Sequence, residues 1–304
     1  MLRRAATTVT DVACRAVGRR QVVRAARFVL LRARLDVRNG REVNGEASLV
    51  DWMLGLTPAG RTFHVVDVGA NLGQWANLVL AAARRTQQLG ELDLHSFEPS
   101  SYTFSRLSEA LAGQHATLNR AALGDRDGSA ILHVVAPGAG TNSLHMSDRM
   151  PDGLTTEVVP MMTLAMYADE ARLDQISLVK IDAEGHDLAV LRGAERLFAE
   201  HRISVAQFEY NHRWIYPRFF LRDVFKLLEP LGYRIGKLTP FGIEFYPGWD
   251  PELETFVEGN YVACAPLMAS KLPSIAWWKS DGKYPDALTR FGSRSPSQGR
   301  RSVI

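Results

Sequence analysis

The densest group of side chains that could do acid–base chemistry follows an apolar stretch at residues 176–181. Asp182, Glu184, His186 and Asp187 lie within six residues there. Carboxylates and imidazoles can accept the proton of a hydroxyl group, which is a poor nucleophile at neutral pH. The same residue types also cap helices or complement helix N-termini. The pattern therefore predicts a catalytic group but does not fix the role of any one member.

A second group, Glu209 and His212, follows the next apolar stretch, residues 203–208. Apolar runs of this length are typical of parallel strands that are buried on both faces. Because the carboxyl ends of such strands meet at one edge of an open α/β sheet, we expect the two groups to share a site. Asp182 and His186 are the first candidates for a general base, and we expect Glu209 or His212 to orient the acceptor.

A divalent metal is an alternative use of these side chains. Mg²⁺ prefers oxygen ligands and could lower the pKa of a bound hydroxyl. The residues that could gather around it are Asp182, Glu184, Glu209 and His212. Their spacing does not by itself indicate a metal site. The two cysteines, Cys14 and Cys264, lie far apart in the sequence and indicate neither a metal cluster nor a disulfide framework.

The stretch at residues 67–73 reads Asp-Val-Gly-Ala-Asn-Leu-Gly and joins a short apolar strand to a helix. Its glycines let the backbone approach a ligand, and the helix that follows presents free N–H groups. A dinucleotide fingerprint needs a glycine where Asn71 stands, and no Gly-Lys-Ser/Thr follows to form a P-loop. Asp67 would repel a phosphate and suits an amine or a sulfonium. An NAD-dependent dehydrogenase or epimerase is therefore disfavoured.

Glu98 stands at the tip of the second predicted strand, residues 92–97, and Pro99 ends that strand. The two oxygens of Glu98 could accept both ribose hydroxyls of a bound nucleoside. A helix N-terminus would also favour a carboxylate here. The spacing from the glycine turn is about the one expected of a ribose-binding residue, which favours ligand binding.

Together these stretches resemble the FkbM family of class I S-adenosylmethionine-dependent methyltransferases. The turn at 67–73 is similar to motif I of that class. Phe97-Glu98-Pro99 and the stretch 180–187, Lys-Ile-Asp-Ala-Glu-Gly-His-Asp, resemble further family signatures in the family's order, between about residues 65 and 266. The resemblance implies S-adenosyl-L-methionine as the cofactor and methyl transfer to a small-molecule hydroxyl. The cofactor-binding residues that we expect are Asp67, Gly69, Asn71, Gly73, Glu98 and Asp125.

The resemblance also brings two loops to the site. Asp125 lies where the class has a polar contact to the adenine, although an Asp in the turn Gly-Asp-Arg-Asp-Gly needs no ligand to explain it. The stretch Gly-Thr-Asn-Ser at 140–143 resembles a family loop near the active site. We expect Asn142, Ser143 and Glu184 to contact the substrate.

The predicted elements alternate between strand and helix. We expect helices at 42–58, 74–89, 102–112, 188–199 and 219–228, and strands at 63–68, 92–97, 116–123, 129–135, 176–181, 203–208, 233–238, 243–246 and 260–265. With the resemblance, this predicts an α/β, Rossmann-like class I methyltransferase fold. Its mostly parallel seven-stranded sheet is flanked by helices, ends in an antiparallel pair and carries a basic helical N-terminal extension.

Charge is distributed unevenly along the 304 residues. The net charge is +3, but residues 1–41 carry +9, residues 269–304 carry +5 and residues 42–268 carry −11. We interpret these parts as a basic helical arm, a C-terminal extension that is disordered from about residue 292, and an FkbM-like methyltransferase domain between them. Because an acidic body repels phosphate, we expect no nucleic-acid partner.

Residues 9–35 of the arm mix Arg with Ala, Val and Leu, which predicts a helix. Arginines interrupt every apolar run before about 18 residues, so neither a transmembrane span nor a secretory signal is expected. The alternatives are peripheral contact with an anionic membrane, a solvated or loosely ordered arm on the acidic body, and, third, an organellar transit peptide. We expect a cytoplasmic protein.

The sequence thus predicts an S-adenosylmethionine-dependent O-methyltransferase that acts on a hydroxyl of a sugar, glycolipid or related natural product. Its acceptor would be a small molecule or a lipid-linked glycan. The alternative is a non-catalytic scaffold or binding protein that retains the fold. Glu98 and the charged stretch 182–187 disfavour that alternative, because a scaffold has no need of them.

Overall fold

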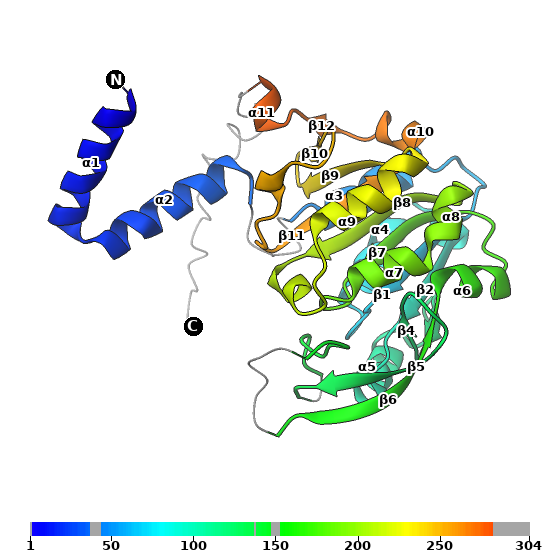
Figure 1. Ribbon diagram of the computed structural model, residues 1–304. Coiled ribbons are helices and arrows are strands. Elements are labelled where there is room, and N and C mark those ends of the chain that lie inside the picture. Colours follow the sequence, from blue (N-terminus) through cyan, green and yellow to red (C-terminus); the bar gives the residue numbers. More distant parts are fainter. Residues whose placement is uncertain (1, 37–43, 137, 147–152, 282–304) are drawn as a thin grey trace, which may run out of the picture.

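The computed structural model describes residues 2–36, 44–136, 138–146 and 153–281. The disorder that the sequence predicts from residue 292 lies outside these residues. Figure 1 shows a body built around one large sheet, with helices on its faces and a smaller sheet beside it. Two further helices at the N-terminus project away from this body.

The large sheet has nine strands in the order β12-β10-β9-β11-β8-β7-β1-β2-β3. They are β1 (Phe63–Val68), β2 (Leu92–Phe97), β3 (Thr117–Asn119), β7 (Ile176–Ile181), β8 (Ile203–Tyr210), β9 (Arg234–Thr239), β10 (Gly242–Phe245), β11 (Gly259–Cys264) and β12 (Ser274–Ile275). Strands β3, β2, β1, β7 and β8 are parallel neighbours, and β11 is antiparallel to both β8 and β9. The predicted mostly parallel α/β sheet is confirmed. Its strands number nine rather than seven, because β10 and β12 extend the edge beyond β9.

Helices cover both faces of this sheet and create two apolar cores. One face carries α3 (Glu46–Leu56), α4 (Gln74–Arg85) and α5 (Ser101–Ala110), and the other carries α6 (Leu164–Glu170), α7 (Asp187–Gly193), α8 (Glu195–Ala199) and α9 (Leu221–Leu228). Successive side chains of a strand point to opposite faces, so Val65 of β1 packs in the first core and Val66 in the second. This double burial explains why four of the six residues in each of β1 and β7 are apolar.

The smaller sheet has the order β4-β6-β5 and was only partly predicted. It consists of β4 (Ala122–Leu123), β5 (Gly128–Val134) and β6 (Thr155–Met162). The prediction of one strand over 116–123 was wrong, because the chain pairs with β2 only as far as Asn119 and then crosses to the small sheet. Strand β6 was missed because Pro160 interrupts its pattern and proline is uncommon within strands.

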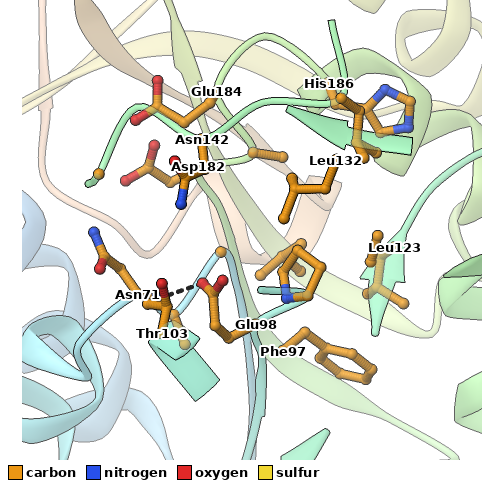
Figure 2. A pocket seen from close by; sticks show the side chains of 18 of the residues that line it. Asn71, Phe97, Glu98, Thr103, Leu123, Leu132, Asn142, Asp182, Glu184 and His186 are labelled. Atoms are coloured by element: carbon orange, nitrogen blue, oxygen red, sulfur yellow. Dashed lines mark hydrogen bonds between the residues drawn. The ribbon is translucent and has the colours of Figure 1, made fainter. Parts of the chain in front are cut away.

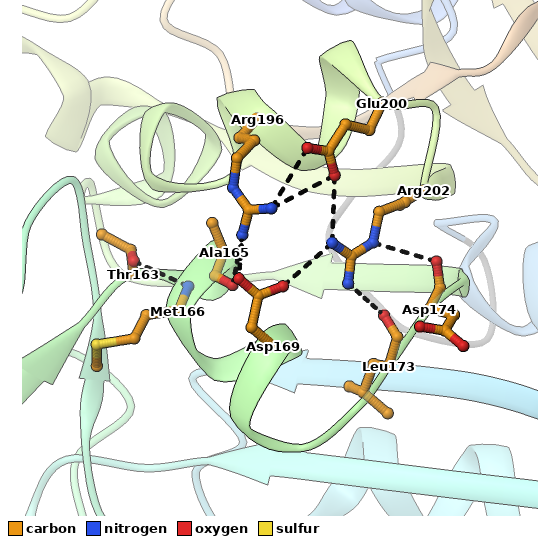
Figure 3. A network of polar contacts seen from close by, with 9 residues as sticks. All are labelled: Thr163, Ala165, Met166, Asp169, Leu173, Asp174, Arg196, Glu200 and Arg202. Atoms are coloured by element: carbon orange, nitrogen blue, oxygen red, sulfur yellow. Dashed lines mark hydrogen bonds and ion pairs between the residues drawn. The ribbon is translucent and has the colours of Figure 1, made fainter.

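A network of polar contacts joins α6 to α8 and to the start of β8 (Figure 3). Asp169 accepts hydrogen bonds from both Arg196 and Arg202. Arg202 also donates to the carbonyl oxygens of Leu173 at 2.9 Å and Asp174 at 3.2 Å. Because exposed ion pairs contribute little to stability, the main effect of the network is to fix where the two helices lie.

The basic arm forms two helices, α1 (Leu2–Val17) and α2 (Arg19–Ala33). Gly18 separates them with a φ of 87°, a conformation that glycine adopts without steric cost. At the base of the arm, Leu35 is buried and Asp36 pairs with Lys237 of β9, so the arm is fixed where it meets the body. Across the described part of the chain, no helix is both long and apolar enough to span a bilayer.

Candidate functional site

A cavity lies at the carboxyl edge of the large sheet, between that edge and the small sheet. It holds about 800 Å³ of empty space, including its open mouth. The chain runs from β1 to β2 on one side and returns to β7 on the other, so this is the topological switch point where open α/β sheets bind ligands. Figure 2 shows the polar side chains Asn142, Asp182 and Glu184 near one another, and the apolar Leu123 and Leu132 on the opposite side.

The turns after β1, β2 and β7 are bonded to one another at the floor of this cavity. Asp182 donates its N–H to the Val68 carbonyl at 3.0 Å, and Gly69 donates its N–H to the Phe97 carbonyl at 3.0 Å. Gly69 has a φ of 75°, and a Cβ added to it would lie 2.0 Å from the carbonyl oxygen of Asp182. Only glycine fits here, so the predicted importance of Gly69 has a structural cause.

Glu98 is held at the tip of β2 by two backbone donors. Its Oε2 accepts the N–H of Asn71 and its Oε1 accepts the N–H of Ser100, both at 3.0 Å. The side chain lines the cavity but is only 7% exposed. Burial raises the pKa of Glu98 to about 7, although the two N–H bonds act against this rise. Each oxygen keeps a further lone pair, so the carboxylate can still accept two hydroxyl groups.

Asp67 lies beneath the turn, outside the cavity lining, and is fully buried. The Nζ of Lys180 lies 3.5 Å from Asp67 Oδ1 and 3.2 Å from Asp182 Oδ2. Burial raises the pKa of Asp67, while Lys180 lowers it. For Lys180, burial lowers the pKa, but Asp182 and Asp67 outweigh it and the net shift is upward.

Lys180 lines the cavity, yet it was not among the predicted site residues. Two signals could have identified it. It is the one charged residue of the stretch 176–181, and it stands directly opposite Asp67 in the register of β1 and β7. Only the first of these signals can be read without knowing the strand pairing.

Asp182 and Glu184 both line the cavity, as does His186 of the same stretch. The side chain of Asp182 is 33% exposed, and its position is fixed by Lys180. The side chain of Glu184 is only 18% exposed, and Arg213 Nε lies 2.9 Å from its Oε2. Burial, followed by the charge of Asp182, raises the pKa of Glu184 to about 8. Asp182 is therefore the carboxylate that a ligand reaches most easily.

His186 lines the cavity, but both of its ring nitrogens are enclosed. Its Nδ1 lies 2.9 Å from Nε2 of His145. Its Nε2 faces the backbone of Gly124, since a Cβ added there would lie 2.9 Å from it. Burial, followed by His145, lowers the pKa of His186 to about 4, so the ring is neutral at pH 7. His145 was not predicted, because its partner lies 41 residues away in the sequence.

The predicted substrate loop is bonded to the turn after β7. Asn142 lines the cavity, and its Oδ1 accepts the N–H of Val135 at 3.0 Å. Ser143 lies behind the lining; its Oγ donates to the Glu184 carbonyl at 2.8 Å and accepts the N–H of His145 at 3.1 Å. Ser143 thus holds the loop rather than presenting its hydroxyl to the cavity.

Four more predicted residues lie outside the lining. Gly73 packs against α5, where an added Cβ would lie 2.9 Å from Cδ1 of Leu107. Asp125 is exposed, and its Oδ1 lies 3.3 Å from Nη1 of Arg126. His212 is also exposed, at the start of the short helix η2 (His212–Ile215). Glu209 is 8% exposed; burial, followed by Asp182, raises its pKa to about 9.

No metal centre is found among the residues that the structure describes, in the sense of three or more His, Cys, Asp or Glu side chains arranged around one point. The four side chains proposed for Mg²⁺ differ widely in exposure. Glu184 is paired with Arg213, while His212 faces solvent. The geometry gives the magnesium alternative no support.

Apolar side chains complete the cavity and were not predicted as site residues. They include Val68, Trp75, Phe97, Leu123, Leu132 and Leu144. Apolar positions in strands resemble one another in the sequence, so nothing distinguishes those that face a ligand from those that face a core. With the carboxylates, they make a site suited to a nucleoside that carries a positive charge.

Comparison with protein-family models identifies one family. A family model described as the methyltransferase FkbM domain matches residues 67–235. A search of curated proteins found no match.

Several solved structures are similar to the chain. The methyltransferase FkbM from Methylobacillus flagellatus KT is 17% identical with a TM-score of 0.43, over 73% of this chain and 49% of that one. A SAM-dependent methyltransferase from Agrobacterium tumefaciens is 9% identical with a TM-score of 0.37, over 72% and 62%. The precorrin-6y C5,15-methyltransferase from Geobacter metallireducens GS-15 is 12% identical with a TM-score of 0.36, over 72% and 87%. The chain thus spans about half the length of the Methylobacillus protein.

Proposed function

This chain belongs to the FkbM methyltransferase family, and we propose that it is an S-adenosylmethionine-dependent O-methyltransferase that acts on a hydroxyl of a sugar, glycolipid or related natural product. The observation that carries the proposal is Glu98. It combines burial, two backbone donors and a place in the cavity lining beside the glycine turn. A carboxylate held in this way is suited to the two hydroxyls of a ribose.

The cofactor, when bound, supplies an electrophilic methyl group on a positively charged sulfur. Glu98 would accept the ribose hydroxyls, and the apolar Phe97, Leu123 and Leu132 would contact the adenine. The turn after β1 carries Asn71 where a dinucleotide site needs a glycine, so the cavity should bind S-adenosylmethionine more tightly than a dinucleotide.

The structure separates the candidates for the general base by access. Asp182 is the most exposed of the lining carboxylates, and Lys180 fixes its position. Both nitrogens of His186 are enclosed. Glu209, whose pKa burial raises to about 9, is protonated at neutral pH and can donate but not accept a proton. Asp182 is therefore the residue that we assign to take the proton of the acceptor hydroxyl while the site aligns it with the methyl carbon.

A transfer assay with a radiolabelled methyl donor tests this assignment. The acceptors are free sugars, sugar phosphates, glycolipids and polyketide alcohols, each with Asp182→Asn beside the wild type. We expect Asp182→Asn to lower kcat by about 10² to 10⁴, with the cofactor Kd changed by less than about threefold. The matched control is Asp51→Asn, an exposed carboxylate of α3 that pairs with Arg85.

Full activity in Asp182→Asn would refute its role as the base. A loss confined to His186→Gln would assign that role to His186 instead. Cofactor binding without transfer to any class of hydroxyl would favour the non-catalytic alternative.

A further inference from the structure

The first helix of the arm separates apolar from polar residues. On a helical wheel of α1, one side carries Ala5, Ala6, Val9, Val12, Ala13, Ala16 and Val17, and the opposite side carries Arg3, Arg4, Thr7, Thr8, Thr10, Asp11 and Arg15. Val9 is 68% exposed and Val12 is 59% exposed, so no described part of the body covers the apolar side. An uncovered apolar helix face with a charged back is typical of a helix that lies in a membrane interface.

The second helix shows a similar but less complete separation, with its own phase. Its apolar side carries Val22, Val23, Ala26, Val29, Leu30 and Ala33, with Arg19 among them at the first position of the helix. The other side carries Arg20, Arg24 and Arg27, together with Phe28 and Leu31. None of the α2 residues is buried, and Val29 is 64% exposed. Gly18 breaks the chain between the helices, so each can turn its own apolar side toward a common surface.

The charge of the arm indicates which kind of surface its apolar sides contact. Residues 2–33 hold eight arginines and one aspartate. If the apolar sides paired with those of a second copy, sixteen arginines would be brought together, and like charges repel. An anionic bilayer satisfies both features, because it accepts the apolar side and attracts the arginines.

The arm also leaves the body at the edge where the cavity lies. Five residues that pair with one another on neighbouring strands form a row across the large sheet: Val68, Ile181, Phe208, Tyr261 and Lys237. Val68 lines the cavity, and Lys237 pairs with Asp36 at the base of the arm. Four strand spacings separate the two ends of the row, about 19 Å. Figure 1 shows α1 and α2 projecting from the body.

We infer that α1 and α2 form a docking surface for an anionic lipid bilayer, which holds the carboxyl edge of the sheet near the membrane. Docking itself depends on the arm alone. Its consequence for the acceptor rests on the proposed function: a lipid-linked hydroxyl in the bilayer would be close to the cavity, whereas a free sugar would gain nothing from docking.

Flotation of the full-length protein with vesicles tests the docking. One set of vesicles contains phosphatidylcholine alone, and the other contains phosphatidylglycerol and phosphatidylcholine at one to three. We expect binding to the anionic set only, with most of it lost in 1 M NaCl, where the Debye length falls to about 3 Å. Arg24→Gln with Arg27→Gln should weaken binding by roughly 30-fold.

The matched pair Val12→Glu and Thr8→Glu separates insertion from simple charge. Both substitutions change the net charge by the same amount, but only Val12 lies on the apolar side of α1. We expect Val12→Glu to weaken binding at least tenfold and Thr8→Glu less than threefold. Circular dichroism at 222 nm and the cofactor Kd confirm that each variant is folded.

Equal binding to both vesicle sets, no binding, or equal effects of the paired substitutions would overturn the inference. So would a dimer in sedimentation analysis that Val12→Glu dissociates, because it would assign the apolar side to a second copy. The flotation result does not depend on methyl transfer, so docking and the proposed function can fail separately.

Discussion

At the scale of single residues, the site depends on a few groups whose surroundings change their ordinary chemistry. Glu98 would be ionised in water at pH 7, but in this cavity its pKa is about 7. Gly69 stands where no side chain fits. Asp187, at the start of α7, is 1% exposed and accepts the N–H of Gly185 at 3.2 Å. Each of the three leads to a measurement.

Cofactor binding should strengthen with pH. The ionised form of Glu98 is the better acceptor for two ribose hydroxyls, and ionisation rises from about a tenth to about nine tenths between pH 6 and pH 8 when the pKa is about 7. We expect the Kd for S-adenosylmethionine, measured by calorimetry, to fall about tenfold over this range. Glu98→Gln should remove the dependence, and the exposed Glu109→Gln of α5 should keep it. A Kd that is flat in the wild type would contradict the role of Glu98.

Gly69→Ala should destabilise the fold by more than its backbone angle alone explains. Gly60 has almost the same φ, 76° against 75°, but nothing lies within 4 Å of a Cβ added to it. We expect Gly60→Ala to cost about 1–2 kcal/mol in the free energy of unfolding, measured in urea. Gly69→Ala should cost at least roughly 2 kcal/mol more, because its methyl group would collide with the turn after β7. Equal losses would show that the turns separate easily.

The free energy of unfolding should fall as the pH rises through the range set by Asp187. Burial, followed by Asp182, raises the pKa of Asp187 from 3.8 to about 7. The folded state therefore holds a proton that the unfolded state releases, and this favours folding most at low pH. Between pH 5.5 and 7.5 the contribution should fall by about 2 kcal/mol. Asp187→Asn should make this part of the profile less steep by that amount in urea titrations, while Glu98, Glu184 and Glu209, whose pKa values are also raised, keep their own contributions. A profile unchanged by the substitution would refute the assignment.

At the scale of elements, the side chain of Ser143 bonds the loop that carries Asn142 to the turn after β7. Ser143 both donates to the Glu184 carbonyl and accepts from the N–H of His145. Ser143→Ala should therefore lower the free energy of unfolding by about 1–2 kcal/mol. It should also raise the cofactor Kd, because the loop lines the cavity. Thr141→Ala, at an exposed position of the same loop, is the control. Equal effects of the two substitutions would show that Ser143 does not fix the loop.

Three of the strands that are buried on both faces could be predicted to the residue, whereas β8 runs two residues beyond its predicted end at 208. Strands β1, β2 and β7 were predicted with the bounds that the structure has, because their apolar runs end at clear turn residues. The small sheet could not be predicted in this way. Pairing of β5 with β6 joins residues as far apart as 128 and 161, and such pairing leaves no local pattern. Strand β12 was not predicted for the same reason, because its pairing with β10 also leaves no local pattern.

The site residues also divide into those that a local sequence pattern predicts and those that only the fold reveals. Asp182, Glu184 and His186 were found because they are neighbours in the sequence, and Glu98 because it follows a strand. His145 and Arg213 were missed because only the fold brings each of them near its partner. Lys180 was also missed, although it lies two residues from its partner Asp182; only its pairing with Asp67 depends on the fold. Apolar lining residues carry no chemical signal at all.

At the scale of the whole molecule, opposite charges are separated along the chain. The acidic middle, −11 over residues 42–268, contains the cavity, and the basic arm, +9 over residues 1–41, leaves the body at the same sheet edge. An acidic cavity favours a cationic cofactor, while a basic arm favours an anionic surface. Because the two preferences belong to different parts of the chain, salt should weaken vesicle binding far more than cofactor binding.

Titration calorimetry of the full-length protein with S-adenosylmethionine tests most directly whether the cavity binds a methyl donor. NAD is the control ligand and Glu98→Gln is the control variant. We expect one site per chain for S-adenosylmethionine and no heat of binding for NAD. The affinity of Glu98→Gln for S-adenosylmethionine should be about 30-fold weaker, since hydrogen bonds to a charged group contribute about 1.5–3 kcal/mol. Binding of NAD instead, or no binding of S-adenosylmethionine at pH 8, would contradict the assignment of the cavity to a methyl donor.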